Sequence, residues 1–198
     1  MPPWEKNVKR LIDIGASLAA LILFFPLMLL VAAAIKLESP GPVFYIQERI
    51  GYRGIKFRLW KFRSMIADAE KHSGPVWAGK NDDRITRTGK IIRKMRIDEI
   101  PQFYNILIGD MSLVGPRPER EFFVDQLKKK IPYYPLRLKV KPGLTGWAQI
   151  KHNYDRTLDD VREKLKYDLY YIENMSLSMD FKILLATVYV VLGAKGAH

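Results

Sequence analysis

The longest apolar segment of the chain lies near its amino terminus. Asp13 and Lys36 enclose 22 residues, 14–35, that carry no charged side chain. As a helix they would be about 33 Å long at ~1.5 Å per residue, enough to cross a hydrocarbon core of ~30 Å. The segment also exceeds the apolar part of a secretory signal, which is about 7–15 residues long. We therefore expect a membrane helix, with a fully buried core helix as the alternative.

Basic side chains flank this segment on both sides: Lys6, Lys9 and Arg10 before it, and Lys36, Arg49, Arg53, Lys56 and Arg58 after it. The positive-inside rule favours the cytoplasm for both flanks, which a straight spanning helix cannot satisfy. Pro26 follows Phe25 within the segment, where a proline removes a backbone donor and clashes with the preceding turn. We expect residues 11–36 to form a re-entrant helix–break–helix bent at Phe25 and Pro26, with a kinked spanning helix as the alternative. Ser17 or nearby side chains would bond the backbone at the bend.

The remaining pattern predicts a mostly helical α+β fold in a single domain over residues 1–198. Residues 43–50 and 55–62 alternate around Gly51-Tyr52-Arg53-Gly54, which is typical of a small β-hairpin. Helices are expected at about 64–72, 86–97, 119–129, 157–173 and 179–193, and another from about Asp98. Loops are expected at 73–83, 109–118 and 141–147. Residues 181–192 are too short to span and should pack in the core or lie at the membrane interface.

Charge and composition narrow the function. The 33 Lys and Arg exceed the 21 Asp and Glu, and the net charge of +12 predicts an anionic partner: nucleic acid, phospholipid or a phosphorylated substrate. The chain has no Cys, which excludes disulfides, thiolate nucleophiles and Cys-type metal sites, and its three His are far apart. Walker A, GxGxxG, GxSxG and HExxH motifs are absent, so phosphate chemistry here would not use a P-loop.

Residues 84–96 form a strongly basic segment. Arg84, Arg87, Lys90 and Arg93 recur at every third position, and Ile91, Ile92 and Met95 supply an apolar side. An amphipathic helix at an anionic lipid interface would have this pattern, and so would a nucleic-acid-reading helix or an ordinary solvated face. Because a membrane segment is already expected, lipid or phosphate is favoured over nucleic acid.

The segment RIDEIPQ places two adjacent acids, Asp98 and Glu99, in a basic region. A helix amino terminus and nearby cations favour the ionised carboxylate, and an ionised Asp can attack phosphorus to form an acyl-phosphate. Glu99 could hold Mg²⁺ or orient the nucleophile, since Mg²⁺ is bound by one or two carboxylates with substrate phosphate oxygens. The alternative is that Asp98 only caps the helix.

Several basic and polar residues could bind phosphate, nucleotide or sugar. Gly115-Pro116-Arg117-Pro118 is a rigid loop that presents one guanidinium, whose planar donors suit phosphate. Lys61 and Arg63 offer two further cations at the end of the hairpin. Thr145 and Gln149, in the loop around 143–149, could contact nucleotide or sugar, although a purely structural turn explains them equally well. Each cation could also be an ordinary surface charge.

The ordered blocks KRLIDI, WKFRSM, RIDEIPQFYNILIGDMSLVGPRP, VKPGLTGWAQI and YDLYYIENMSLSMD resemble the bacterial sugar transferase family. These are monotopic polyprenyl-phosphate phosphoglycosyl transferases, and the resemblance runs from about Lys9 to about Leu192. It implies an enzyme on the cytoplasmic face of the bacterial inner membrane, held there by a re-entrant helix. Where the family carries Ser-Pro in that helix, this chain has Phe25-Pro26.

The resemblance also implies an activity. Such enzymes move a sugar-1-phosphate from a UDP-sugar to undecaprenyl phosphate and release UMP, the first membrane step of surface polysaccharide synthesis. Asp98 would attack the β-phosphorus and carry the phosphosugar, Asp98 and Glu99 would hold Mg²⁺, and Lys61 and Arg117 would contact phosphate. The sugar, a homodimeric state and membership of a longer chain stay open. The rival functions are a nucleic-acid or anionic-lipid binding module and a simple membrane anchor.

Overall fold

The computed structural model describes residues 1–66, 69, 82–151 and 157–192. The described chain is mostly helical, as expected, with two small two-stranded sheets. Its elements are α1 (Pro3–Glu38), β1 (Phe44–Ile50), β2 (Lys56–Phe62), α2 (Arg87–Lys94), α3 (Gln102–Ile108), β3 (Ser112–Val114), α4 (Glu121–Lys130), β4 (Gly143–Thr145), α5 (Trp147–Lys151), α6 (Leu158–Glu173) and α7 (Leu177–Leu192). Three 3₁₀ turns, at Tyr52–Gly54, Ile97–Glu99 and Tyr134–Lys139, join neighbouring elements.

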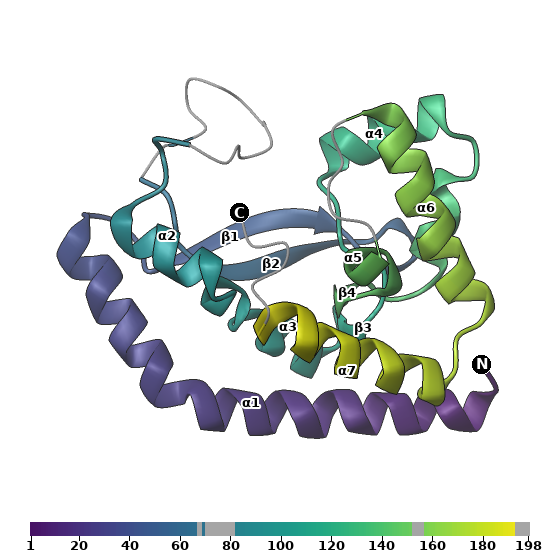
Figure 1. Cartoon of the computed structure of the whole chain (residues 1–198), viewed down its shortest axis with the longest axis horizontal. Coiled ribbons are helices and arrows are strands. Elements are labelled where there is room, and N and C mark those ends of the chain that lie inside the picture. The colour runs from purple at the N-terminus through teal and green to yellow at the C-terminus, as the bar shows by residue number, and fades with distance from the viewer. Residues whose placement is uncertain (67–68, 70–81, 152–156, 193–198) are drawn as a thin grey trace.

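The apolar amino-terminal segment is one continuous helix that is bent along its length (Figure 1). It is long and apolar enough to cross a membrane, and its most apolar stretch is almost entirely unburied. Pro26 lies inside the helix, and prolines are a common cause of sharp bends because they remove one backbone donor. The expected break into two helices is therefore not confirmed: the helix continues through Pro26 and extends beyond 11–36 at both ends.

Ser17 does not hydrogen-bond to the backbone at the bend. Its side chain is fully buried, and its Oγ has no hydrogen-bond partner among the described residues. It also lies more than two helical turns before Pro26. Phe25, by contrast, is exposed at the position where the resemblance placed a serine in relatives.

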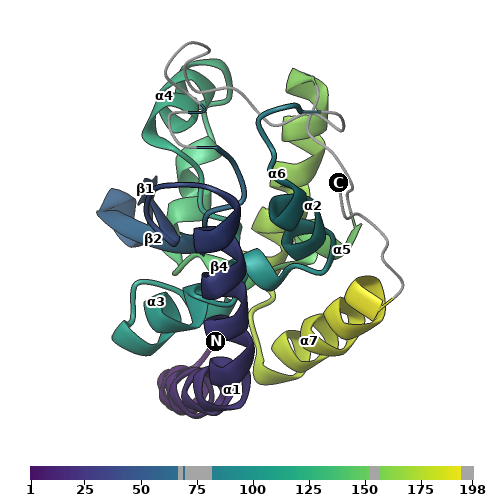
Figure 2. The same ribbon diagram turned by 90° about the vertical axis from the view of Figure 1, so that its left-hand side faces the viewer.

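Three charged side chains hold the first half of α1 against the rest of the fold. Lys9 forms an ion pair with Asp180 of α7 at 2.5 Å. Arg10 donates to two carbonyls at the end of α3, at 2.6 and 2.8 Å. Asp13 is buried and accepts a hydrogen bond from the amide of Leu113 at 3.0 Å. Figure 2 shows the result, with α3 and α7 on either side of α1.

The other end of α1 is held to the same body. Buried Arg63, just after β2, donates to the carbonyls of Ser39 and Pro40 at 2.8 and 2.7 Å. Glu38 accepts the amides of Arg87 and Thr88 at 2.7 and 2.9 Å, which pairs a carboxylate with the positive amino terminus of α2. Both ends of α1 therefore contact one folded domain.

The predicted hairpin is confirmed. Strands β1 and β2 are antiparallel, with Glu48 opposite Arg58. The outer edge of β2 is covered by Asn105 of α3, whose side chain accepts from the amide of Trp60 at 3.0 Å and donates to the carbonyl of Arg58 at 2.7 Å. This amide side chain replaces a third strand and joins the hairpin to the helix that follows the two acids.

Two helix predictions need correction. Residues 64–66 are not helical, because Met65 instead pairs with Ile85 in an isolated bridge; the rest of the predicted helix at 64–72 lies largely outside the described residues, as does most of the loop at 73–83. The helix expected from Asp98 is a 3₁₀ turn, and the α-helix begins only at Gln102. The other predicted helices are observed within a few residues of their expected limits.

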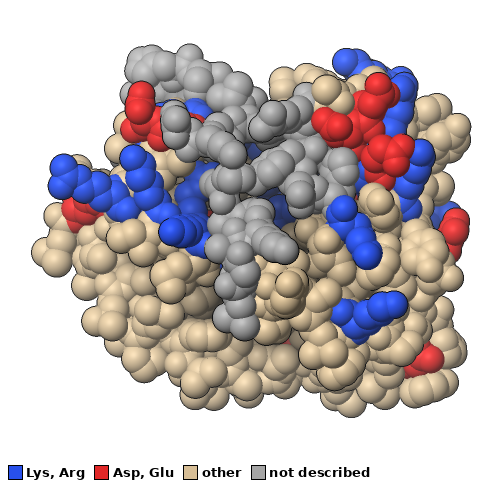
Figure 3. Space-filling model, viewed as in Figure 1, with Lys and Arg blue, Asp and Glu red and all other residues tan. Residues whose placement is uncertain are grey.

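The buried apolar residues form three clusters. The first joins β2, α3, β3, α6 and α7, and the second joins α4 and α6 with the 3₁₀ turn at 134–139. The third packs the second half of α1 onto β2 and α2, through Val31, Ile35, Phe62 and Ile92. Figure 3 shows that the surface over α1 and α7 is largely uncharged, and the basic residues gather above it. Helix α7 contributes both to the core, through Ile183, and to this surface, through Phe181 and Leu185.

Candidate functional site

Asp98 and Glu99 lie in the short 3₁₀ turn, residues 97–99, that joins α2 to α3. Arg96 immediately before it has a left-handed backbone (φ 56°, ψ 20°), which is uncommon for a residue other than glycine. This conformation ends α2 and turns the chain toward β2. The residue that caps α3 is Pro101, which offers no side-chain hydrogen bond. The alternative that Asp98 is only the cap of that helix is therefore wrong.

Glu99 is the organising anion of the site. Its carboxylate is 2.6 Å from Arg117, 3.1 Å from Lys61 and 3.8 Å from Arg96. The residue is buried, and burial alone would favour the neutral acid. The charges of Arg117 and Lys61 outweigh this effect and hold the pKa of Glu99 well below its usual range. Glu99 is therefore ionised at any physiological pH and holds two cations beside Asp98.

Asp98 has the opposite surroundings. It is half-buried, and within the described parts of the chain its carboxylate has no hydrogen bond or close ion pair. Burial, together with the charge of Glu99, raises its pKa to about 6, although Lys61 and Arg93 oppose the rise. This corrects the expectation that the local cations would dominate. The carboxylate is still mostly ionised at neutral pH, and it is more basic than an ordinary aspartate.

Lys61 and Arg117 come from separate parts of the fold and meet at Glu99. Lys61 lies near the end of β2, and Arg117 lies in the loop after β3. Burial lowers the pKa of Lys61, and the charge of Glu99 raises that of Arg117. The Arg117 side chain is 31% exposed, so part of its guanidinium can meet a ligand. The sequence offered both residues as phosphate contacts, and the structure pairs both with Glu99.

The other three predicted contacts are placed differently. Arg63 is buried against the end of α1, and its donors point to backbone carbonyls there. The hydroxyl of Thr145 is 2.7 Å from that of Thr187 in α7. The side-chain nitrogen of Gln149 donates to the carbonyl of Leu144 at 3.2 Å, and its amide oxygen is buried without a partner among the described residues. No described contact joins these three side chains to Asp98 or Glu99.

Comparison with known proteins places this site in a family. A family model described as "Bacterial sugar transferase" matches residues 4–194, nearly the whole chain. The chain belongs to the bacterial sugar transferase family. The match includes α1, the two acids, and the loop that carries Arg117.

Two relatives of this family member are named as undecaprenyl-phosphate sugar phosphotransferases. It is 52% identical, over 96% of its length, to UDP-N-acetylgalactosamine-undecaprenyl-phosphate N-acetylgalactosaminephosphotransferase of Aeromonas hydrophila. It is 44% identical, over 91% of its length, to UDP-glucose:undecaprenyl-phosphate glucose-1-phosphate transferase of Klebsiella pneumoniae. The matches cover 45% and 39% of these relatives, so the chain spans less than half of their length. It matches 93% of the exopolysaccharide production protein PSS of Rhizobium leguminosarum bv. phaseoli, at 41% identity.

The acid pair of this family member fits a magnesium ion. Among the described residues, no group of three or more His, Cys, Asp or Glu side chains could hold a metal. Mg²⁺ needs fewer protein ligands than that, because waters and substrate phosphates complete its coordination. Asp98 offers a carboxylate that has no close partner within the described residues, whereas Glu99 would have to share its oxygens with Arg117 and Lys61. The donor set therefore suits a metal shared between protein and diphosphate.

Sequence reasoning missed Arg137, which is buried behind the Arg117 loop. The residue lies in the 3₁₀ turn at 134–139 and donates to the carbonyl of Arg117 at 2.9 Å. Its partner Asp168 did carry a signal. Val161, Leu165 and Asp168 are buried at helical spacing on α6, so an acid occupies the apolar stripe of the helix. A charge at such a position predicts a buried partner.

Proposed function

We propose that this sugar transferase moves a sugar-1-phosphate from a UDP-sugar to undecaprenyl phosphate and releases UMP. The printed names of its relatives supply the reaction class. The observation that carries the proposal is the contrast between the acids. Glu99 is bound to two cations, whereas Asp98 is ionised, half-buried and without a close partner in the part of the chain that the structure describes.

In the first step, a carboxylate oxygen of Asp98 attacks the β-phosphorus of the UDP-sugar. An oxygen–phosphorus bond forms, the bond from that phosphorus to the bridging oxygen breaks, and UMP leaves with the electron pair. The product on the enzyme is an aspartyl phosphosugar. The raised pKa of Asp98, about 6, supports this role because it makes the carboxylate a stronger nucleophile while leaving it ionised at pH 7.

In the second step, a phosphate oxygen of undecaprenyl phosphate attacks the phosphorus of this intermediate. The bond to Asp98 breaks, the carboxylate is regenerated, and the sugar leaves on undecaprenyl diphosphate. Lys61 and Arg117 would hold the phosphate oxygens in both steps, and Glu99 would keep these cations in place. Mg²⁺ bound by Asp98 and Glu99 would neutralise charge on the diphosphate.

The proposed topology is monotopic, at the cytoplasmic face of the bacterial inner membrane. The bent α1 would enter one leaflet and return, because Lys9 and Arg10 near its start and Glu38 at its end all contact the same domain. Helices α2 and α7 would lie at the interface through exposed apolar side chains. A homodimer remains a prediction, and the anionic partner is phosphate and lipid rather than nucleic acid.

The chemistry is tested by UMP release from a panel of UDP-sugars with undecaprenyl phosphate and Mg²⁺. We expect turnover with at least one UDP-hexose and a phosphosugar adduct on Asp98, detected by mass spectrometry after a quench without acceptor. Asp98→Asn should abolish both, whereas the exposed control Asp159→Asn should retain them. Turnover retained by Asp98→Asn would refute the nucleophile, and no turnover with any UDP-sugar would favour a binding module.

The topology is tested with cysteines, which the native chain lacks. Thiols introduced one at a time by Lys6→Cys and Arg53→Cys should react with an impermeant maleimide only in opened cells, because both sites would face the cytoplasm. Both positions are exposed on the protein. Labelling of either one from outside intact spheroplasts would contradict re-entry.

A further inference from the structure

The loop that presents Arg117 is fixed through its backbone. All three carbonyls of residues 116–118 accept hydrogen bonds, from Gly143 N at 3.0 Å, Arg137 Nη2 at 2.9 Å and Arg49 Nη1 at 3.2 Å respectively. The two prolines of the loop also fix their own φ angles. Among these donors, Arg137 is the one that bonds the carbonyl of Arg117 itself, the residue whose guanidinium reaches Glu99.

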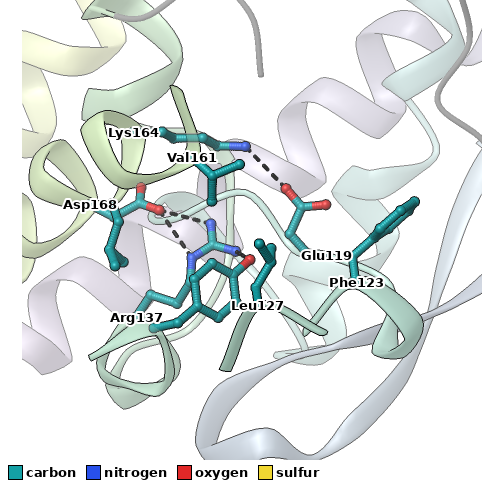
Figure 4. Close-up of a pocket in the computed structure, with 9 residues that line it drawn as sticks. Glu119, Phe123, Leu127, Arg137, Val161, Lys164 and Asp168 are labelled. Atoms are coloured by element: carbon teal, nitrogen blue, oxygen red, sulfur yellow. Dashed lines mark hydrogen bonds and ion pairs between the residues drawn. The ribbon is translucent and has the colours of Figure 1, made fainter. Parts of the chain in front are cut away.

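Arg137 is itself held rigidly. Its side chain is 3% exposed, and its Nε and Nη2 are 3.1 and 2.8 Å from one oxygen of Asp168 on α6. Its Nη1 donates to the hydroxyl of Tyr134 at 2.9 Å. Figure 4 shows the guanidinium pointing to Asp168, with the separate ion pair of Lys164 and Glu119 alongside. The orientation of Arg137 is therefore set by a helix that carries none of the proposed catalytic groups.

We infer that Arg137, oriented by Asp168, is a positioning residue that keeps the guanidinium of Arg117 on Glu99 and directed toward the substrate phosphate. The inference rests on the proposed function. The path has three contacts: Asp168 to Arg137, Arg137 to the Arg117 carbonyl, and Arg117 to Glu99 at 2.6 Å. Arg137 touches neither acid in any described contact, so its effect on the chemistry passes through Arg117.

A purely structural role makes a different prediction. Replacing a buried ion pair with apolar residues of similar volume is often neutral or stabilising, because the desolvation of two charges is avoided. Stability alone thus gives little reason to keep Arg137 and Asp168. A positioning role requires the planar guanidinium, since Lys cannot bridge Asp168 and a carbonyl with the same fork of donors.

The experiment compares the double variant Arg137→Met/Asp168→Leu and the single variant Arg137→Lys with the wild-type protein. We expect the melting temperature of the double variant to fall by no more than about 10 °C, because the Arg117 carbonyl and the Tyr134 hydroxyl lose a donor while the desolvation of two buried charges is avoided. We expect its kcat for UMP release to fall at least about tenfold, as for a misplaced contact group. Arg137→Lys should show the same fall in kcat, and it tests the inference by itself if the double variant does not fold.

The decisive measurement repeats the Arg137→Lys change in an Arg117→Ala background, using single-turnover UMP release. Because Arg137 acts through Arg117, the second change should cost no further rate. A full additional loss in that background, or an unchanged rate in either Arg137 variant, would overturn the inference. The exposed pair variant Arg162→Met/Asp159→Leu on α6 is the control and should behave as wild type. Wild-type turnover in the same assay reports separately on the proposed function.

Discussion

At the scale of single residues, the adjacent acids Asp98 and Glu99 differ in the groups that surround them. Glu99 pairs with Arg117 and Lys61, whereas Asp98 has no hydrogen bond or close ion pair among the described residues. This difference gives one carboxylate a strongly depressed pKa and the other a raised one, so the two acids can serve separate tasks. Glu99 holds the two cations, and Asp98 is the proposed nucleophile.

Asp98 should cost stability at neutral pH. A carboxyl whose pKa rises to about 6 binds its proton more tightly in the native state, so folding loses stability as the pH rises from about 4 to about 6. Asp98→Asn removes this loss, and we expect the variant to be about 1–3 kcal/mol more stable than wild type at pH 7. The gain should vanish below about pH 4, where both native and unfolded states hold the proton. Denaturant unfolding of the variant and the wild type at pH 4 and pH 7 measures both effects. Equal stability of the two proteins at pH 7 would contradict the prediction.

Glu99→Gln should shift the pH profile in the opposite direction to loss of Arg117. The charge of Glu99 raises the pKa of Asp98, so its removal moves the acid limb of the rate profile to lower pH. The rate should also fall, because Arg117 and Lys61 lose the anion that holds them. Initial rates of UMP release from pH 4.5 to pH 8 measure both effects, with exposed Glu163→Gln as the control. An upward shift would show that burial of Asp98 had changed instead.

The sequence identified the acids and two of the cations but not their pairing. RIDEIPQ, Lys61 and Arg117 are visible as charged residues in recognisable blocks. Which acid each cation faces depends on how β2 and the Arg117 loop approach the 3₁₀ turn, and these contacts span 18 and 38 positions along the chain. Arg137 escaped notice for the same reason, since its bond to Arg117 bridges 20 positions.

At the scale of elements, Arg63 is a helix-end contact rather than the phosphate ligand its sequence position suggested. Its guanidinium binds carbonyls after α1, where cations complement the negative end of a helix. Arg63→Met leaves those carbonyls without a donor, and we expect a loss of on the order of 2–4 kcal/mol in unfolding free energy. The KM for UDP-sugar should change by less than about twofold, since no phosphate contact is lost.

The control for this prediction is Arg58→Met, an exposed basic residue on β2, the strand that precedes Arg63, and it should change neither quantity. Thermal unfolding and a KM determination on purified protein are sufficient. A large rise in KM with normal stability would restore Arg63 to the substrate site.

Elements with local signals were predicted well, and those with distant causes were not. Helix α6 is preceded by its cap Thr157, whose side chain and Asp160 form a reciprocal capping box within four residues. Residues 64–66 have helical character in sequence, but the partner that makes Met65 extended is Ile85, twenty positions later. Likewise, the rule that proline breaks helices overestimated the effect of Pro26. The contacts at both ends of α1 favour a single continuous helix.

At the scale of the whole molecule, apolar and basic surfaces are separated. Exposed apolar side chains follow α1 and α7, and on the face shown in Figure 3 the Lys and Arg side chains of the described residues gather above these helices. This arrangement suits a body that rests on an anionic bilayer, where apolar contact and charge attraction add.

The apolar surface of α7 can be tested apart from α1. Leu185→Asp/Val188→Asp changes two exposed positions, so the fold should be retained. Partition onto vesicles that contain phosphatidylglycerol should weaken roughly tenfold or more, as expected when two apolar contacts with the bilayer are replaced by charge. Vesicle co-sedimentation measures this, and the exposed pair Asp125→Ala/Lys128→Ala on α4 is the control. Unchanged partition would place α7 away from lipid.

The two attached ends of α1 also decide where a fusion partner would be found. Pro3 begins a helix whose first turns touch α3 and α7, and Glu38 ends it against α2. A fluorescent protein joined ahead of residue 1 would thus lie on the same side of the membrane as the acid pair. Under the proposed topology that side is the cytoplasm, where the fusion partner would fold and fluoresce. Export of such a fusion to the periplasm would require the first turns of α1 to lose their contacts with α3 and α7.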